Sequence, residues 1–200
     1  MKKLYALLLC ASLWLTLASC NTPPEPEPRT VYTIPAAAGA WYTEEGAEDS
    51  IGSRLDPDSL RVGLTYDRKR IFTLLRFPLD TALYPEFLDF HELQSARLWL
   101  KIRESNGVPA LQVAVVTADW DENTALAQAR ALAENPLPAR EPRDEGEGWF
   151  SIDVTDWLLA HLGGAPNHGL ALFEAAHSTE TAFASCVSED DRPKLVITTY

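Results

Sequence analysis

The chain has 200 residues, of which 17 are Lys or Arg and 29 are Asp or Glu, so its formal charge is −12. We do not expect it to bind nucleic acid, because that binding depends on basic side chains that neutralise phosphates. Its cysteines are Cys10, Cys20 and Cys186. Since Cys10 and Cys20 lie in the N-terminal segment, the domain that follows contains no cysteine pair for a disulfide.

The first 19 residues have the layout of a secretory signal peptide. Lys2 and Lys3 supply a positive start, and residues 4–18 are almost entirely apolar. As a helix, this apolar run would be about 22 Å long, which is short of the roughly 30 Å of hydrocarbon in a bilayer. We therefore predict a signal peptide over residues 1–19 rather than a retained transmembrane helix.

The end of this peptide, Leu17-Ala18-Ser19-Cys20, resembles the lipobox of bacterial lipoproteins, in which the cysteine receives a diacylglycerol. The resemblance predicts lipidation of Cys20 and a membrane anchor, since each buried methylene of an acyl chain contributes about 0.8 kcal/mol. The alternative is an ordinary signal peptide cut near Ser19, with an unmodified Cys20. Asn21 is not the Asp that favours inner-membrane retention in similar lipoproteins. The expected location is the cell envelope, at the outer membrane if the cell has one.

Residues 20–29 form a predicted tether between this anchor and a folded domain over residues 30–200. The tether contains four prolines and two glutamates and has no large apolar side chain to bury. A proline-rich segment of this kind is extended, at about 3.1 Å per residue. Removal of the signal peptide leaves 15 basic against 29 acidic side chains, a formal charge of −14.

The domain is dominated by the two-residue periodicity of β-strands. Within residues 97–103, Leu98, Leu100 and Ile102 alternate with basic residues and Trp99, which predicts a strand with one buried and one solvated face. Similar patterns predict further strands over residues 30–34, 60–66, 70–77, 111–117, 149–154, 169–174, 181–187 and 194–200. Turn residues separate these strands, and Asn167 and Gly169 suit a turn with positive φ.

Two segments depart from the strand pattern. Residues 155–163 predict a short helix in which Thr155 is the cap and Gly163 the stop. The alanine-rich residues 124–134 predict a second helix. Many short strands with one or two short helices indicate a mainly β fold, an antiparallel β-sandwich.

The order of the motifs resembles the DNRLRE-domain family. These motifs are Leu60-Arg61-Val62-Gly63, Leu74-Leu75-Arg76-Phe77, Ala96-Arg97-Leu98-Trp99-Leu100, Trp120-Asp121-Glu122-Asn123-Thr124, Asp153-Val154-Thr155, Asn167-His168-Gly169 and Arg192-Pro193-Lys194-Leu195. The resemblance covers residues 31–200 and implies a jelly-roll-like sandwich of the carbohydrate-binding-module type. Some members of that grouping bind alginate, a polyuronate.

The chain departs from the family pattern at three places. Trp41-Tyr42 and Ser50-Ile51-Gly52 stand where members usually carry an Asp and an Asn-Tyr-Gly turn, and Pro78 replaces an Asp that commonly follows Leu-Arg-Phe. The resemblance therefore implies the fold more directly than a ligand site.

Several residues of these motifs have structural explanations. We expect Trp120 and Trp157 to fill the core, because aromatic side chains dominate core burial. Glu122 and Asp153 lie where a carboxylate can accept backbone N–H bonds at the start of a loop or helix. Cys186 is expected to be a small buried hydrophobe in an apolar strand.

The solvated face of residues 97–103 is the candidate binding site, formed by Arg97, Trp99, Lys101 and Arg103. Trp99 offers an apolar surface for a sugar ring, and the basic residues can donate hydrogen bonds to hydroxyls or to a uronate carboxylate. The alternative is a solvated face on which long basic side chains cover one exposed Trp. A polyanion would also meet overall repulsion from the acidic domain.

Metal binding is supported only by acidic clusters at residues 56–58, 119–122 and 189–191. A structural calcium could occupy such a cluster, but none has the ligand spacing of a defined calcium loop. The four histidines, His91, His161, His168 and His177, show no zinc-ligand spacing. We therefore expect no cofactor.

The sequence also lacks the signatures of common enzymes. It has no nucleophile elbow, no phosphate-binding glycine loop and no His-Glu-x-x-His motif. Cys186 and His177 could imitate a nucleophile and base, but a thiol in an apolar strand stays protonated.

Two functional classes remain. The first is a non-catalytic lipoprotein of the envelope that binds polysaccharide. The second is a structural or interaction module that contacts an envelope protein or the cell wall without binding glycan.

Overall fold

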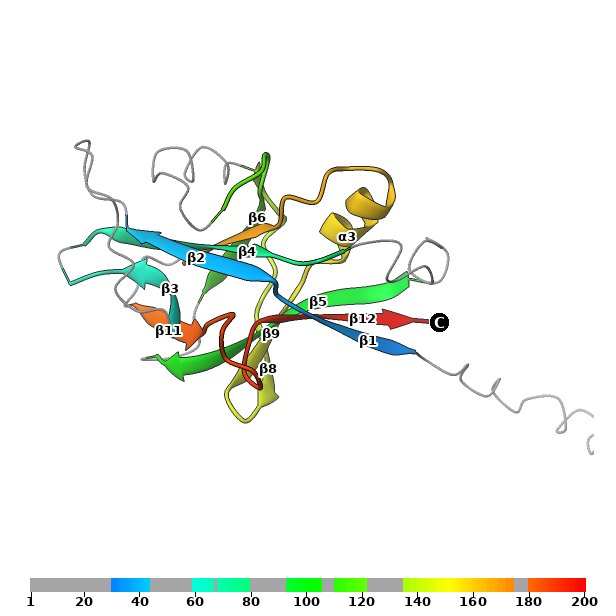
Figure 1. The fold of residues 1–200 in the computed structure, drawn as a ribbon. Coiled ribbons are helices and arrows are strands. Elements are labelled where there is room, and N and C mark those ends of the chain that lie inside the picture. The colour runs from blue at the N-terminus through cyan, green and yellow to red at the C-terminus, as the bar shows by residue number, and fades with distance from the viewer. Residues whose placement is uncertain are drawn as a thin grey trace, which may run out of the picture.

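The computed structural model describes residues 30–43, 59–66, 68–79, 93–105, 110–121, 135–174 and 180–200. Within these residues the chain is mainly β, with one short helix (Figure 1). Its elements are β1 (Val31–Pro35), β2 (Ala38–Thr43), β3 (Ser59–Leu64), β4 (Arg70–Arg76), β5 (Leu93–Glu104), β6 (Leu111–Val115), β7 (Asn135–Pro136), β8 (Arg143–Gly146), β9 (Trp149–Asp153), α3 (Thr155–Leu162), β10 (Leu170–Glu174), β11 (Thr181–Ala184) and β12 (Lys194–Thr199). The signal peptide, Cys20, the tether and the helix predicted at residues 124–134 lie outside the described residues.

Every strand pairing is antiparallel, and the strands form one curled sheet whose two halves face each other. The half that we call the β5 sheet contains β1, β12, β5, β9 and β8, with β11 continuing beside the end of β5. The half that we call the β4 sheet contains β7, β6, β10, β4 and β2. β3 joins the halves, because it pairs with β11 on one side and with β4 on the other. This arrangement confirms the predicted β-sandwich.

The main core lies between the two halves. From β5 it takes Leu98 and Leu100, which have no exposed surface, and from β10 it takes Leu170 and Leu172. Burying such a side chain contributes about 1.5–3 kcal/mol. Trp157 from α3 joins the same core and meets Phe77 edge to face, with ring centroids 6.2 Å apart. The helix thus fills the space between the sheets, and the predicted burial of Trp157 is confirmed.

A second, smaller apolar cluster lies on the other face of the β4 sheet. Phe72 and Leu74 of β4 point into this cluster, and Tyr42 stacks on Phe72 with ring centroids 5.2 Å apart. Trp120 also belongs to this cluster and is 4 % exposed, so its predicted burial is confirmed. Because β4 is buried on both faces, residues 71–75 do not alternate between apolar and polar, and Thr73 is the one polar residue among them.

The helix α3 begins differently from the prediction. Its N-cap is Val154, and Thr155 is the first helical residue. The Thr155 hydroxyl instead accepts a hydrogen bond of 3.0 Å from the backbone N–H of Ala96 on β5. The predicted capping role of Thr155 was therefore wrong, because its side chain bonds to the neighbouring strand β5. Gly163 ends the helix as predicted.

The structure also corrects several strand boundaries. β2, β7 and β8 were not predicted. β11 ends at Ala184 rather than Val187, because the chain turns at residues 186–187. Cys186 is therefore half-buried in a turn and not in a strand, although it packs against the main core.

The turn before β10 agrees with the prediction at Gly169 but not at Asn167. Gly169 has a φ of +101°, as predicted, and a Cβ there would lie 2.0 Å from the carbonyl oxygen of Leu75. Asn167 does not have positive φ. Its side-chain amide instead donates a 2.8 Å hydrogen bond to the carbonyl of Phe77 and thereby ties the turn to the end of β4.

Candidate functional site

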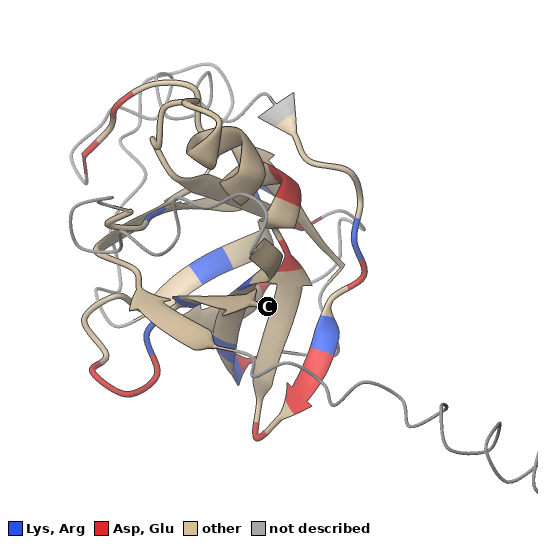
Figure 2. Cartoon of the chain, turned by 90° about the vertical axis from the view of Figure 1, so that its right-hand side faces the viewer, with Lys and Arg blue, Asp and Glu red and all other residues tan. Residues whose placement is uncertain are grey.

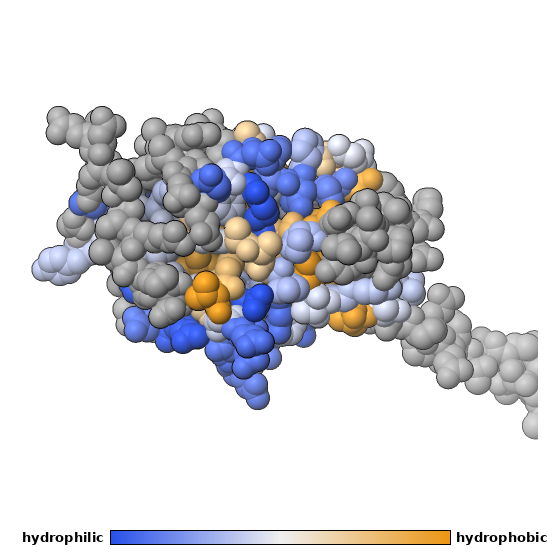
Figure 3. Space-filling model, in the orientation of Figure 1, coloured by the Kyte–Doolittle hydropathy of each residue, from blue (hydrophilic) through white to orange (hydrophobic). Residues whose placement is uncertain are grey.

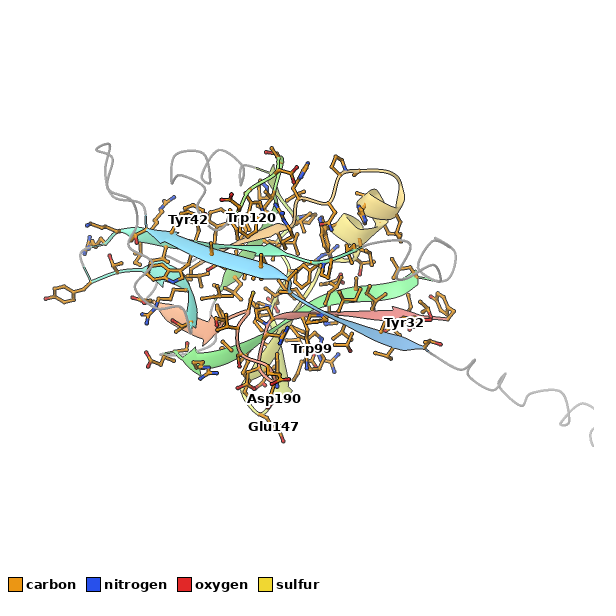
Figure 4. All side chains as sticks on the ribbon, viewed as in Figure 1. Tyr32, Tyr42, Trp99, Trp120, Glu147 and Asp190 are labelled. Atoms are coloured by element: carbon orange, nitrogen blue, oxygen red, sulfur yellow. The ribbon has the colours of Figure 1, made fainter. Side chains whose placement is uncertain are left out.

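The outer face of the β5 sheet brings together side chains from three strands. On β5, Trp99 and Lys101 point away from the buried Leu98 and Leu100, as the alternation predicts. Lys194 of β12 is paired with Trp99, and Trp149 of β9 is paired with Lys101. Figure 4 shows Trp99 on this outer side, with the turn that carries Glu147 beyond it.

The two tryptophans form the centre of this face, and we call them the indole pair. The ring centroids of Trp99 and Trp149 are 6.1 Å apart and their planes are inclined by 56°. Both side chains are half-buried. The indole N–H of Trp99 is buried and has no hydrogen-bond partner among the described residues. The pair therefore presents apolar ring surface, while the Trp99 N–H is shielded from solvent.

Two lysine ammonium groups lie over these rings. The Nζ atom of Lys194 is 4.0 Å from the ring centroid of Trp149 and 5.4 Å from that of Trp99. The Nζ atom of Lys101 is 5.5 Å from the Trp149 centroid and donates a hydrogen bond to the carbonyl oxygen of Glu147. Among the described residues, neither ammonium forms an ion pair with a carboxylate. The indole pair thus lies beneath two positive charges that no carboxylate of the described residues neutralises.

Arg97 is held at the side of the indole pair. Its Nε donates a 2.8 Å hydrogen bond to the Ser151 hydroxyl and lies 3.8 Å from Glu145. The Ser151 hydroxyl donates a 2.5 Å hydrogen bond to the same carboxylate, and Arg143 lies 3.6 Å from it. Glu145 is therefore shared between two arginines, and these arginines are less available to a ligand than the two lysines.

Arg103 lies at the far end of the strand. Its guanidinium is 3.6 Å from Asp191 and 3.4 Å from the Ser188 hydroxyl, both in the loop between β11 and β12. The four residues predicted from the sequence are thus separated into three environments. Trp99 and Lys101 share the indole pair, Arg97 bonds to Ser151 and Glu145, and Arg103 bonds to a loop.

Acidic groups border this face. Figure 2 shows red segments on the β8–β9 hairpin and blue bands on the neighbouring strands. The local charge therefore differs from the net charge of the chain, because Arg97, Lys101 and Arg103 lie on β5 and Lys194 begins β12. Figure 3, in the orientation of Figure 1, shows a described surface that is mostly hydrophilic, with separate apolar areas.

Sequence reasoning missed Trp149 and Lys194. The alternation of Trp149, Ser151 and Asp153 on β9 indicated that these three share a face. The pairing of β9 and β12 with opposite edges of β5 is what brings Trp149 and Lys194 to Trp99. Strand order of this kind is not encoded in local periodicity.

Asp153 lies at the edge of the same face, where β9 leads into α3. Its carboxylate accepts a 2.9 Å hydrogen bond from the backbone N–H of Thr155, which confirms the predicted role. Burial opposes ionisation of this carboxyl, but hydrogen bonds from Thr155 and the charges of Arg97 and Arg140 outweigh burial and lower its pKa. Asp153 therefore stabilises the junction in its ionised form.

A second polar cluster lies beside Trp120, on the β4 sheet. The Trp120 indole N–H donates a 2.7 Å hydrogen bond to the carbonyl of His168, and the Arg76 guanidinium lies 5.2 Å from the Trp120 ring centroid. Asp119 is 3.1 Å from the Nδ1 atom of His168 and 3.7 Å from Arg76. These contacts join three segments and leave Trp120 buried, so the cluster has a structural role.

The described residues contain no group of three or more His, Cys, Asp or Glu side chains that could hold a metal ion. Of the predicted acidic clusters, residues 56–58 and Glu122 lie outside the described residues. Asp119 instead contacts His168 and Arg76, and Asp191 contacts Arg103. His177 also lies outside the described residues, so its proximity to Cys186 stays untested. No helix in the described part of the chain has the length and apolar character needed to cross a membrane.

Comparison with known protein families identifies a match over most of the chain. The family model for carbohydrate-binding module family 96 matches residues 32–199. No match was found among curated proteins. The matched range includes every strand from β2 to β12, and the indole pair lies within it.

Proposed function

The chain belongs to carbohydrate-binding module family 96, and we propose that it binds polysaccharide on the outer face of the β5 sheet. The indole pair is the observation that carries this proposal. A pyranose ring has an apolar face that packs on indole surface and a rim of hydroxyls that pair with polar groups nearby. Trp99 and Trp149 supply the first property, while Lys101 and Lys194 supply the second.

The charges around the indole pair favour an acidic polysaccharide. The ammonium groups of Lys101 and Lys194 have no carboxylate partner among the described residues, so a uronate carboxylate would form charge-assisted hydrogen bonds with them. Repulsion from the acidic domain acts over longer distances and is screened by salt, whereas close ion pairs are screened less. We expect alginate or polygalacturonate to bind more tightly than a neutral glucan.

We also propose that the domain is non-catalytic and is displayed at the cell envelope by lipidated Cys20. The family match supports a non-catalytic role, because carbohydrate-binding modules generally hold a ligand without catalysing its reaction. Anchoring is supported by the lipobox-like Leu17-Ala18-Ser19-Cys20 and by the proline-rich tether that follows. Together these features would concentrate polysaccharide near the membrane.

Calorimetric titration of the full chain, purified in a mild detergent, tests the binding proposal. The ligands are alginate, polygalacturonate and the neutral glucan laminarin. Trp99→Ala and Trp149→Ala should each weaken binding at least about tenfold, equivalent to about 1.4 kcal/mol. Tyr66→Ala is the matched control, because it removes a fully exposed aromatic side chain from the β3–β4 turn. Its affinity should equal that of the wild type.

Unchanged affinity in both tryptophan variants would place any binding elsewhere on the domain. If none of the three polysaccharides binds the wild type, the alternative function, a structural module that contacts an envelope protein or the cell wall, is favoured. Thermal unfolding of each variant shows whether a loss of binding reflects a loss of fold.

A further inference from the structure

Lys194 occupies the surface on which a sugar would stack. It lies on β12, whereas Trp149 lies on β9, on the opposite side of β5. Adjacent strands are about 4.8 Å apart, so these two backbones are separated by almost 10 Å. The ammonium nevertheless lies 4.0 Å from the Trp149 ring centroid. The Lys194 side chain and the Trp149 ring therefore reach toward each other over β5.

The Lys194 side chain also lies over Trp99. Lys194 and Trp99 are direct partners in the β5–β12 pairing, and the Nζ atom is 5.4 Å from the Trp99 ring centroid. This position agrees with the burial of the Trp99 indole N–H, which has no acceptor. The side chain thus covers both rings at once. It is attached only at its backbone and forms no ion pair in the described part of the protein.

We propose that Lys194 is a displaceable strap, which covers the indole pair in the free protein and leaves the face of Trp149 when a saccharide ring stacks there. This inference rests on the proposed function. It adds that binding requires a specific side chain to move and that this movement sets the preference between ligands. A ring cannot pack on Trp149 while the ammonium lies 4.0 Å from the ring centroid.

The strap gives acidic and neutral saccharides different affinities. In either case the ammonium gives up its attraction to the two indoles. An acidic saccharide replaces that attraction with a carboxylate, whereas a neutral saccharide offers only hydroxyls. Shortening the Lys194 side chain should therefore raise the affinity for neutral saccharides and lower the affinity for acidic ones. A residue that merely supported the fold would change both affinities in the same direction.

The position of the strap can be measured with lysine labelled with ¹³C at the ε carbon. Protons above an indole face are shifted upfield by the ring current, so the Lys194 signal of the free full chain should lie upfield of the signal that lysine gives in the denatured chain. Lys194→Arg removes the signal and thereby assigns it. Saturating alginate should move the Lys194 signal to the position of a lysine away from aromatic rings, while the Lys69 signal stays unchanged.

The affinity of variants provides the second measurement. Lys194→Ala should bind laminarin about two- to fivefold more tightly than the wild type does, because the competing cation–π attraction is lost. The same variant should bind alginate more weakly. Lys69→Ala is the matched control, because it removes the same charge from the start of β4, and it should leave both affinities unchanged.

Three results would contradict the proposal that Lys194 is a displaceable strap. The first is a Lys194 signal in the free protein that is not shifted upfield. The second is a shifted signal that persists when alginate is bound, and that result would leave the proposed function intact. The third is a Lys194→Ala variant that weakens both ligands equally. If neither the wild type nor Lys194→Ala binds any of the polysaccharides, the proposed function and the strap fail together.

Discussion

Single residues on β5 show how one alternating strand serves both the core and the surface. Leu98 and Leu100 are fully buried, while Trp99 between them is half-buried on the opposite face. Because successive side chains on a strand point to opposite faces, this division was predictable from the sequence. The contacts that each exposed residue makes could not be predicted from the sequence. Arg97 and Lys101 have the same spacing from Trp99, yet only Arg97 forms an ion pair with Glu145.

Two glycines provide a stability prediction for single residues. Gly169→Ala should lower the free energy of unfolding by more than about 3 kcal/mol, because a Cβ would lie 2.0 Å from the Leu75 carbonyl oxygen and φ is +101°. Gly164→Ala is the matched control. Its φ is +96°, but no atom lies within 4 Å of the added Cβ, so only the backbone strain of about 1–2 kcal/mol applies.

Chemical denaturation of the two glycine variants measures the difference. If Gly164→Ala and Gly169→Ala lose equal stability, the close approach of the β10 turn to β4 has no energetic consequence. A larger loss in Gly169→Ala than in Gly164→Ala would separate the steric effect from the effect of φ.

Elements that carry strong hydropathy patterns were predicted well, and those without such patterns were missed. β2 has the sequence Ala-Gly-Ala-Trp-Tyr-Thr, in which small residues give little strand propensity. It forms because it pairs with β4 along its whole length. Gly39 also lets β2 approach the core closely, since a Cβ there would be 2.7 Å from the Cys186 Sγ atom. Pairing partners of this kind cannot be deduced from the segment itself.

The junction of β9 with α3 provides a pH prediction. Burial opposes ionisation of Asp153, but the Thr155 hydrogen bonds and nearby arginine charges lower its pKa in the folded protein. Its contribution to stability is therefore fully present above the unfolded-state value of about 3.9 and is lost as the pH falls through the folded-state pKa. Asp153→Asn should reduce the free energy of unfolding by about 1 kcal/mol at pH 7, because a charged acceptor becomes a neutral one.

Denaturation at a series of pH values tests this junction. The gap in stability between the wild type and Asp153→Asn should narrow as the pH falls below about 4. Asp190→Asn is the control, because it removes an exposed carboxylate from the loop before β12. A gap that stays constant down to pH 2 would show that the charge of Asp153 does not stabilise the fold.

The whole molecule combines a predictable sandwich with a site whose composition depends on strand order. Many strands, the buried tryptophans and one half of the indole pair were predicted from the sequence. Trp149 was not placed beside Trp99, because 50 positions separate them and only the antiparallel pairing of β5 with β9 joins them. The choice of β9 as the partner of β5 depends on contacts between distant segments, and neither segment alone reveals it.

Membrane attachment is a prediction about the whole molecule. In cells, Cys20→Ala should abolish partitioning into the detergent phase, because the acyl chains that would provide the anchor have no attachment point. Ser19→Ala is the control, since it keeps the thiol and another small residue before it. Phase separation followed by immunoblotting measures the distribution. Persistent detergent partitioning of Cys20→Ala would refute lipidation there.

Calcium dependence can be tested on the folded domain. We expect EDTA to leave the melting temperature unchanged, because Asp119 and Asp191 are engaged by basic partners rather than grouped as ligands. Calorimetric scans with EDTA and with added calcium measure this. A melting temperature that falls in EDTA and recovers with calcium would show that a structural ion is present.

Indole N–H signals test the central claim, that the outer face of the β5 sheet binds polysaccharide. Each tryptophan gives one such signal in a ¹H–¹⁵N spectrum, and Trp→Phe variants assign them. On titration with alginate, the signals of Trp99 and Trp149 should move together and saturate, while those of the buried Trp120 and Trp157 should stay in place. Shifts confined to other tryptophans, or no shift while alginate is bound, would contradict the account.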